Sequence, residues 1–160
     1  MIDVNELKEF EIFDDFSDTQ LQDVARMTEK KRYNAKSHIY EHGDRAKYLF
    51  VVTNGLVSLR EIHPDDPVGI TFEMRERGEM FGAACFMKPR EYTLTAVCLE
   101  DSEVLAIDAD GLLELCQRDA EIGYKMMTKF AQIYFNRYKI AKRQLREMVK
   151  APTTITALPG

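Results

Sequence analysis

The spacing of hydrophobic residues changes twice along this chain and divides it into a helical, a strand-rich and a second helical part. Near the N-terminus, Leu7, Phe10 and Phe13 share one face at helical spacing and predict a short helix. A second helix is predicted to begin behind Ser17 or Asp18, because both residue types are favourable N-caps. Its apolar face consists of Leu21, Val24, Ala25 and Met27.

The middle part of the chain has the pattern of short strands separated by turns. Residues 48–52 are apolar and rich in β-branched and aromatic types, and they lead into Asn54-Gly55, a pair that predicts a hairpin turn. Residues 56–62 then alternate apolar and polar positions, as a half-buried strand does. Further strands are predicted at 68–74, 93–97 and 103–107. Many short strands at even spacing predict a mainly β fold, either a sandwich, a jelly roll or a small barrel.

The last part returns to helical spacing. Asp110 is predicted to cap a short helix, and Asp119 to start a long helix that extends to about residue 149. One stripe of this helix keeps a 3.5-residue repeat, as a coiled-coil seam does: Met127, Ala131, Tyr134, Tyr138, Ala141, Leu145 and Met148. An adjacent stripe consists of Ile122, Met126, Phe130, Ile133 and Ile140. The helix is therefore predicted to pack on its own strands and on a second copy; the alternative is one wide stripe buried within one chain.

Length and charge narrow the class of protein. The 160 residues suffice for one domain with a sizeable core, which we assign to residues 1–150, and residues 151–160 are predicted to be a flexible tail. The net charge of −5 argues against a nucleic-acid-binding protein. No apolar run approaches the roughly 20 residues of a membrane span, and the acidic N-terminus does not resemble a secretory signal. We expect a cytoplasmic protein with no membrane partner.

The usual components of catalytic and metal sites are missing from the sequence. It contains no nucleophile elbow, P-loop or dinucleotide-binding fingerprint. His38 and His42 are four residues apart, but their strand-like surroundings do not place them on one helical face. The three cysteines lack the spacing of a zinc site. We therefore expect no enzymatic activity, no metal site and no required cofactor.

Four segments of the chain resemble, in order and spacing, the motifs of the cyclic-nucleotide-binding domain family. Residues 33–44 are similar to the family's first hairpin, and residues 48–57 to its L-x-x-I-x-x-G-x-V signature. Residues 78–82 resemble the G-x-x-F-G start of its phosphate-binding cassette, and residues 89–96 the P-R-x-A-T-x-x-A end. The resemblance implies a β-roll, which is a double-stranded jelly roll, with N-terminal helices and a long C-terminal dimerisation helix. It also implies a small-molecule sensor that signals through this helix.

The resemblance further implies a ligand site in the cassette between Phe81 and Arg90. A short helix beginning near Gly82 presents free backbone N–H groups to an anion, and Arg90 is suited to bind phosphate oxygens through two hydrogen bonds. The implied ligand is a cyclic nucleotide, cAMP or cGMP. The implied contacts are Gly82, Ala83, Ala84, Cys85, Arg90 and Glu91, with Phe72 and Arg75 on the preceding strand and Tyr134 and Tyr138 on the long helix.

Three departures from the family pattern favour an alternative in which the pocket binds no cyclic nucleotide. Ala83 stands where the family has a glutamate that accepts a hydrogen bond from the ribose, a loss of roughly 1.5–3 kcal/mol. The interval from Ala83 to Arg90 is shorter than the family usually shows, and Glu91 can neutralise the arginine next to it. The chain is then either a sensor of a different small molecule or a dimeric interaction module for an effector protein.

Two further hypotheses concern redox sensing and DNA. Cys85 lies at the start of the cassette helix, where a thiolate is stabilised, and a disulfide with Cys98 would make a redox sensor. In an apolar environment such cysteines are instead inert. Transcription regulators of the family carry a helix-turn-helix domain after the long helix. Only about ten residues follow Lys150, so we expect no DNA binding by this chain.

Overall fold

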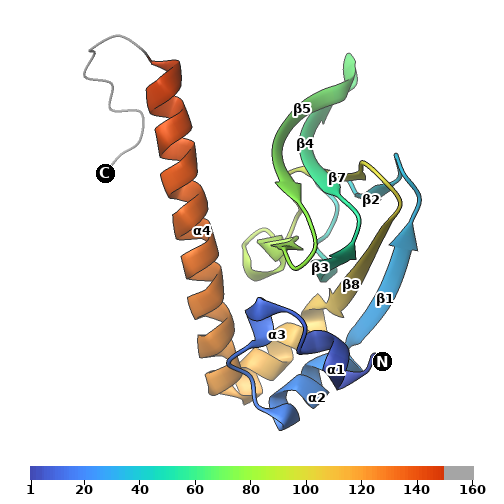
Figure 1. Ribbon diagram of the computed structural model, residues 1–160, viewed down its shortest axis with the longest axis vertical. Coiled ribbons are helices and arrows are strands. Elements are labelled where there is room, and N and C mark those ends of the chain that lie inside the picture. Colours follow the sequence, from blue (N-terminus) through green and yellow to red (C-terminus); the bar gives the residue numbers. More distant parts are fainter. Residues whose placement is uncertain (150–160) are drawn as a thin grey trace.

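The computed structural model describes residues 1–149 as two antiparallel sheets, with short helices at one end and a long helix along one side (Figure 1). The first sheet has the order β1 (Thr28–Tyr33), β8 (Ser102–Asp108), β3 (Tyr48–Asn54), β6 (Met80–Phe81). The second has the order β2 (His38–Tyr40), β7 (Thr95–Cys98), β4 (Val57–His63), β5 (Asp66–Arg75). The predicted mainly β fold, a β-roll with flanking helices, is confirmed. The predicted tail, 151–160, lies outside the described residues.

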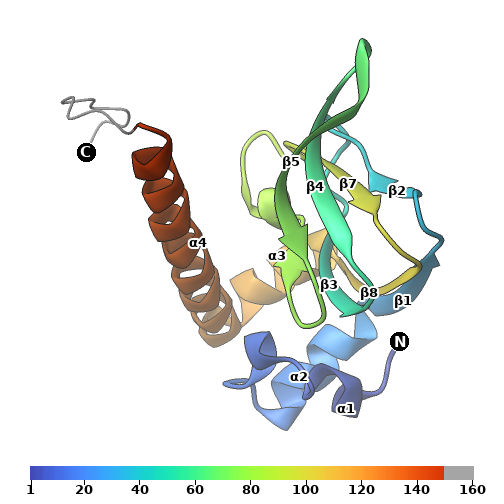
Figure 2. The ribbon, with the colours of Figure 1, turned by 45° about the horizontal axis from the view of Figure 1, so that its top comes forward.

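The turn at Asn54-Gly55 does not form the predicted hairpin. β3 and β4 belong to different sheets, so this turn carries the chain from one sheet to the other. Gly55 has φ +96°, and a Cβ atom there would lie 2.3 Å from Ser102 Oγ, so only glycine fits. The hairpin follows one strand later, where β4 pairs with β5 from Val57↔Arg75 to His63↔Asp66. Figures 1 and 2 show this hairpin extending beyond the rest of the roll.

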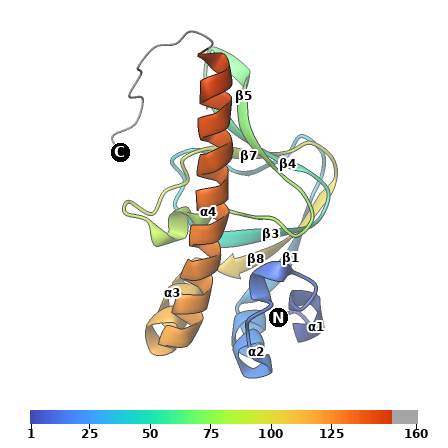
Figure 3. The ribbon, with the colours of Figure 1, turned by 60° about the vertical axis from the view of Figure 1, so that its left-hand side comes forward.

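Helices close one end of the roll. α1 (Val4–Leu7), a 3₁₀ turn (Glu11–Phe13) and α2 (Asp18–Arg26) precede the strands, and α3 (Ala109–Arg118) follows them. Figures 1 and 3 show α1, α2 and α3 at the same end. Ser17 caps α2 in a capping box with Gln20, as predicted for one of the two candidate residues. The cap of α3 is Asp108 rather than Asp110, because the Asp108 carboxylate accepts a hydrogen bond from Gly111 N–H at 2.7 Å.

The long helix α4 (Ala120–Met148) packs on the domain only through its first half. Asp119 caps it as predicted, accepting hydrogen bonds from the N–H groups of the first turn. Ile122, Met126 and Phe130 are 0%, 0% and 6% exposed. Ile140, which the sequence placed in the same stripe, is 53% exposed because the second half of α4 extends away from the roll (Figure 1).

Candidate functional site

The cassette begins with a tight turn that requires glycine. Gly82 has φ +83°, and a Cβ atom there would lie 3.1 Å from Tyr48 O and 3.3 Å from the Tyr92 ring. The short helix predicted near this glycine is present as a 3₁₀ helix, Ala83–Phe86. Its backbone therefore starts directly against the aromatic interior of the roll.

A cavity of about 130 Å³ lies between the cassette, the second sheet and α4. Five of the ten residues predicted to contact a ligand line it: Arg75, Gly82, Ala83, Ala84 and Tyr134. Its other lining residues are Tyr40, Leu59, Glu73, Phe81, Tyr92, Thr93, Leu94 and Arg137. Half of the residues predicted as ligand contacts therefore meet at this cavity.

The other predicted contacts lie elsewhere. Cys85 is buried behind the cavity wall at 1% exposure, while Phe72 and Tyr138 are 59% and 45% exposed to solvent. Neither Arg90 nor Glu91 lines the cavity. Glu91 instead pairs with Arg45 in an isolated β-bridge. The start of the cassette thus lines the cavity, whereas the side chains of Arg90 and Glu91 at its end do not.

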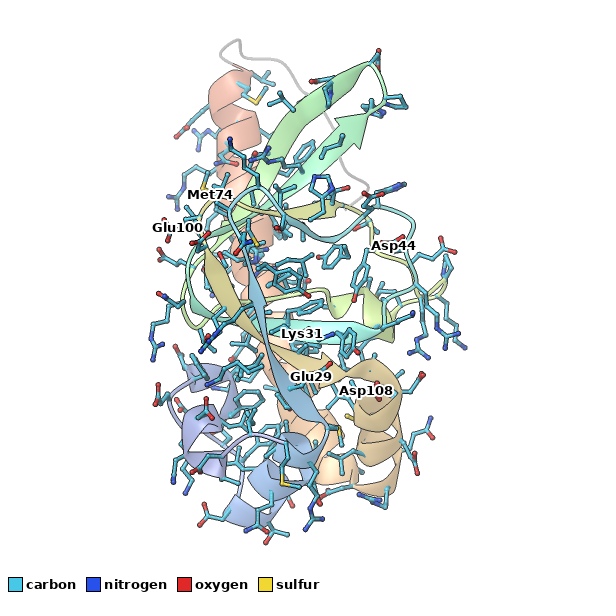
Figure 4. The ribbon with its side chains drawn as sticks, turned by 90° about the vertical axis from the view of Figure 1, so that its right-hand side faces the viewer. Glu29, Lys31, Asp44, Met74, Glu100 and Asp108 are labelled. Carbon is cyan, nitrogen blue, oxygen red and sulfur yellow. The ribbon has the colours of Figure 1, made fainter. Side chains whose placement is uncertain are left out.

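A cluster of aromatic rings packs inside the roll beside the cassette. Tyr40 and Tyr92 stack with centroids 3.6 Å apart and planes 10° apart, and Phe50 and Phe81 stack at 4.9 Å. The Tyr92 hydroxyl donates to Tyr48 O at 2.8 Å and accepts from Tyr48 N–H at 3.1 Å, which fixes the ring. Figure 4 shows rings occupying the interior between β1, where Lys31 is labelled, and the loop of Asp44.

The stacked tyrosines also separate the cavity from a second hollow. Tyr40 and Tyr92 line both the 130 Å³ cavity and a hollow of about 420 Å³ on their other side. Pockets for ligands of nucleotide size usually measure about 300–1,000 Å³. The cassette cavity is below this range because the two rings divide the interior.

Arg90 is held outside the cavity by the helix that follows the sheets. Its Nη2 atom lies 2.8 Å from the Asp110 carboxylate on α3, and Arg45 lies 3.7 Å from the same carboxylate. The hydrogen bond from Arg90 lowers the pKa of Asp110. Arg90 Nε is buried and has no hydrogen-bond partner within residues 1–149. The ion pair directs Arg90 towards α3, and Arg90 is not among the residues that line the cavity.

Replacing Asp110 by asparagine tests this ion pair through its pH dependence. Folding lowers the pKa of Asp110, so the pair stabilises the fold above about pH 4 and the contribution is lost as the pH falls through the folded-state pKa. We expect wild type to be slightly more stable than Asp110→Asn at neutral pH, and the difference to vanish in acid. Urea unfolding of both proteins from about pH 7 to about pH 3 measures it; a difference independent of pH contradicts the ion pair.

Two arginines from different elements approach the cavity. Arg75, at the end of β5, is 4% exposed and donates to Met80 O at 3.1 Å and Met74 O at 2.7 Å. Its remaining partner is the carboxylate of Glu73. Arg137, on α4, is half-buried and donates to the same Met80 O at 3.5 Å. The cations beside the cavity thus come from β5 and α4.

The cysteines do not have the properties of a redox sensor. All three are free thiols, and burial raises the pKa of Cys85 to about 12. Burial also raises the pKa of Cys98. The protonated thiol is therefore favoured at Cys85, and desolvation outweighs the stabilisation that its helix position was expected to give.

The lining residues that sequence reasoning missed include Tyr40, Glu73, Tyr92 and Arg137. For Arg137 a signal was present, because it follows Tyr134 by three positions and therefore lies on the same side of the helix. Within residues 1–149, no group of three or more His, Cys, Asp or Glu is arranged to hold a metal ion. In the same part of the chain, no helix is long and apolar enough to span a bilayer.

Comparison with known families supports the resemblance seen in the motifs. Residues 30–119 match the sequence profile of the cyclic nucleotide-binding domain, and this match covers more than half of the chain. The chain therefore belongs to the cyclic nucleotide-binding domain family. A comparison with curated protein sequences gives no match.

Solved structures share the fold over most of the chain. One is a protein from Geobacter metallireducens GS-15, provisionally described as cyclic nucleotide-binding, with TM-score 0.76 and 25% identity over 86% of this chain and 99% of that one. The sensor domain of the transcriptional regulator DNR from Pseudomonas aeruginosa has TM-score 0.70 and 18% identity over 84% and 90%. The regulatory domain of Toxoplasma gondii PKA, crystallised with cAMP, has TM-score 0.66 and 16% identity over 82% and 49%. The fold is that of the cyclic nucleotide-binding domain.

Proposed function

We propose that this chain is a non-enzymatic regulatory module that acts as a homodimer and does not bind cyclic nucleotides at its cassette. The observation that carries the proposal is the 130 Å³ cavity, which the Tyr40 and Tyr92 rings keep well below nucleotide size. Two further features agree with it. Arg90 is paired with Asp110 on α3, and Ala83 offers no carboxylate for a ribose hydroxyl.

The homodimer is supported by an apolar stripe that stays uncovered within residues 1–149. The predicted seam residues are all exposed: Met127, Ala131, Tyr134, Tyr138, Ala141, Leu145 and Met148. A 3.5-residue repeat matches an identical helix better than any other surface. Alternate positions on β5 are exposed as well: Val68, Ile70, Phe72 and Met74, at 69%, 62%, 59% and 53%. Figures 1 and 2 show β5 as the edge of the roll next to α4, so one partner helix can cover both surfaces.

A thermal-shift titration with cAMP and cGMP tests the cassette. A ligand at 100 times its dissociation constant adds about 2.7 kcal/mol, which raises the Tm of a domain of this size by several degrees. We expect neither nucleotide to change the Tm of the wild type. Arg90→Ala is the matched control: a rise in the wild type that this variant abolishes would show nucleotide bound at the cassette and would overturn the proposal.

A further inference from the structure

The hollow on the other side of the stacked tyrosines differs in chemistry from the cassette cavity. It measures about 420 Å³, and Tyr40 and Tyr92 form its boundary with that cavity. Its other lining residues come from β1, β2, β3 and the loop before β3: Lys31, Tyr33, Ile39, Asp44, Arg45, Lys47, Tyr48 and Phe50. Figure 4 shows this side of the roll, with Lys31 and Asp44 labelled. No residue of the 3₁₀ helix in the cassette or of α4 lines the hollow, so it is a separate site within residues 1–149.

The inner wall of the hollow is a series of aromatic rings that pack on one another. The ring centroids of Tyr48 and Phe50 are 5.8 Å apart, and Phe50 stacks on Tyr40 at 5.8 Å. Tyr40 in turn stacks on Tyr92 at 3.6 Å, and the half-buried Tyr33 adds a further ring to the lining. Aromatic pairs are favourable at centroid distances of about 4.5–7 Å. A ligand with an aromatic ring would therefore extend this series by one member.

Three cations line the hollow beside these rings. The Lys31 ammonium lies 3.9 Å from the centroid of the Tyr48 ring, in a cation–π contact, and 3.0 Å from the Glu29 carboxylate. Arg45 and Lys47 are exposed and therefore lie on the solvent side of the hollow. The chain as a whole has a net charge of −5, so this concentration of positive charge is a local feature.

The carboxylates near Arg45 and Lys47 leave part of this charge uncompensated. Arg45 lies 3.7 Å from the Asp110 carboxylate, but the same carboxylate also pairs with Arg90 at 2.8 Å. Lys47 forms no ion pair in the part of the chain that the structure describes. Asp44 is the acidic residue among the lining residues. Three cations thus face two carboxylates, and one positive charge remains in excess.

We propose that this hollow binds an aromatic carboxylate, with its ring on the aromatic wall and its carboxylate at Arg45 and Lys47. The single negative charge of such a ligand matches the excess positive charge. The volume also fits, because pockets for small organic ligands usually measure about 300–1,000 Å³. An anion without a ring gains nothing from the wall, and an uncharged ring gains nothing from the cations. The inference goes beyond the proposed function, since neither α4 nor the 3₁₀ helix of the cassette takes part.

An NMR titration of the ¹⁵N-labelled full chain with sodium benzoate tests the site, at an ionic strength kept constant with sodium chloride. Two control ligands each lack one feature: cyclohexanecarboxylate has the charge without the aromatic ring, and benzyl alcohol has the ring without the charge. We expect saturable amide shifts with benzoate that cluster on Tyr33, Lys47 and Tyr48. Benzoate should bind about two- to tenfold more tightly than cyclohexanecarboxylate, the usual contribution of an aromatic pair. It should also bind more tightly than benzyl alcohol.

A matched pair of variants tests the cations. Lys47→Glu and Lys139→Glu each reverse one exposed charge, but Lys139 lies on the second half of α4 and does not line the hollow. We expect Lys47→Glu to bind benzoate about three- to tenfold more weakly than the wild type, because an attraction between exposed charges becomes a repulsion. Lys139→Glu should bind benzoate like the wild type. The amide spectrum of each variant without ligand shows that the fold is retained.

Four outcomes would overturn the inference. Equal affinities for benzoate and cyclohexanecarboxylate contradict the role of the aromatic wall. Equal affinities for benzoate and benzyl alcohol, or equal binding of benzoate by the two variants, contradict the role of the cations. Saturable shifts that cluster on Gly82 and Ala83 place benzoate in the cassette cavity instead. If no saturable shift appears, the hollow holds only water. None of these results depends on cAMP or cGMP, so failure of this inference is distinguishable from failure of the proposed function.

Discussion

Replacing Tyr92 by alanine is expected to destabilise the domain by about 3–5 kcal/mol, the usual cost of removing a buried aromatic ring. Tyr92 is 4% exposed and stacks on Tyr40 at 3.6 Å, so its removal leaves Tyr40 without its closest packing partner. Removal of the Tyr92 ring also joins the 130 Å³ cavity to the 420 Å³ hollow, because the ring forms part of both walls. Urea unfolding followed by circular dichroism measures the loss of stability.

Tyr92→Phe separates the contribution of the hydroxyl from that of the ring. Burial raises the pKa of Tyr92 to about 12, so the hydroxyl is protonated at neutral pH and donates to Tyr48 O. Without it, the N–H and C=O of Tyr48 lose their partner, at a cost of about 1–3 kcal/mol. We expect Tyr92→Phe to be intermediate between wild type and Tyr92→Ala. Equal stability of the two variants would contradict the packing role of the ring.

The fold was predictable because its signals are local. Alternating residues such as those of β4 and the capping residues Ser17 and Asp119 are each read from a few neighbours in sequence. The hairpin expected at Asn54-Gly55 was wrong because the same positive-φ turn serves a connection between sheets. The connection between sheets brings Gly55 against Ser102, a residue distant in sequence, and a hairpin would not require this contact.

The site was less predictable because its chemistry depends on contacts between residues that are far apart in sequence. Motif position alone placed Arg90 in the ligand site, and only the structure shows that Asp110 holds it at α3. Tyr40, at the end of β2, stacks on Tyr92, which precedes β7. Their separation in sequence does not predict this contact. The family resemblance named five of the residues that line the cavity, whereas the size of the cavity and the arrangement of its cations follow from three-dimensional packing.

The two halves of the long helix differ in how they pack. Its first half is buried on the domain at Ile122 and Met126, and its second half is exposed. Arg137 lies at the transition between the two halves, beside the cavity. A helix anchored at one end and free at the other changes direction at low cost, since few packed contacts oppose the movement.

A chain with both Tyr138→Asp and Leu145→Asp is expected to be monomeric at concentrations where the wild type is a dimer. Both residues belong to the exposed stripe of α4, at 45% and 40% exposure in the single chain, and neither lines the cavity. In a paired helix each aspartate buries an unpaired carboxylate, at a cost of about 3–5 kcal/mol. Even 3 kcal/mol weakens the dimer by roughly a hundredfold. Analytical ultracentrifugation over a range of concentrations gives the dissociation constant.

Arg143→Gln provides the control for charge, since it makes the net charge of the same helix more negative without placing a carboxylate on the stripe. On a helical projection Arg143 lies opposite Ala141 and Leu145, so this variant is expected to dimerise like the wild type. The monomeric double variant should keep the wild-type circular dichroism spectrum, because both substitutions are at exposed positions of the single chain. A wild type that stays monomeric at all concentrations, or a double variant that still dimerises, would show that α4 is not the dimer seam.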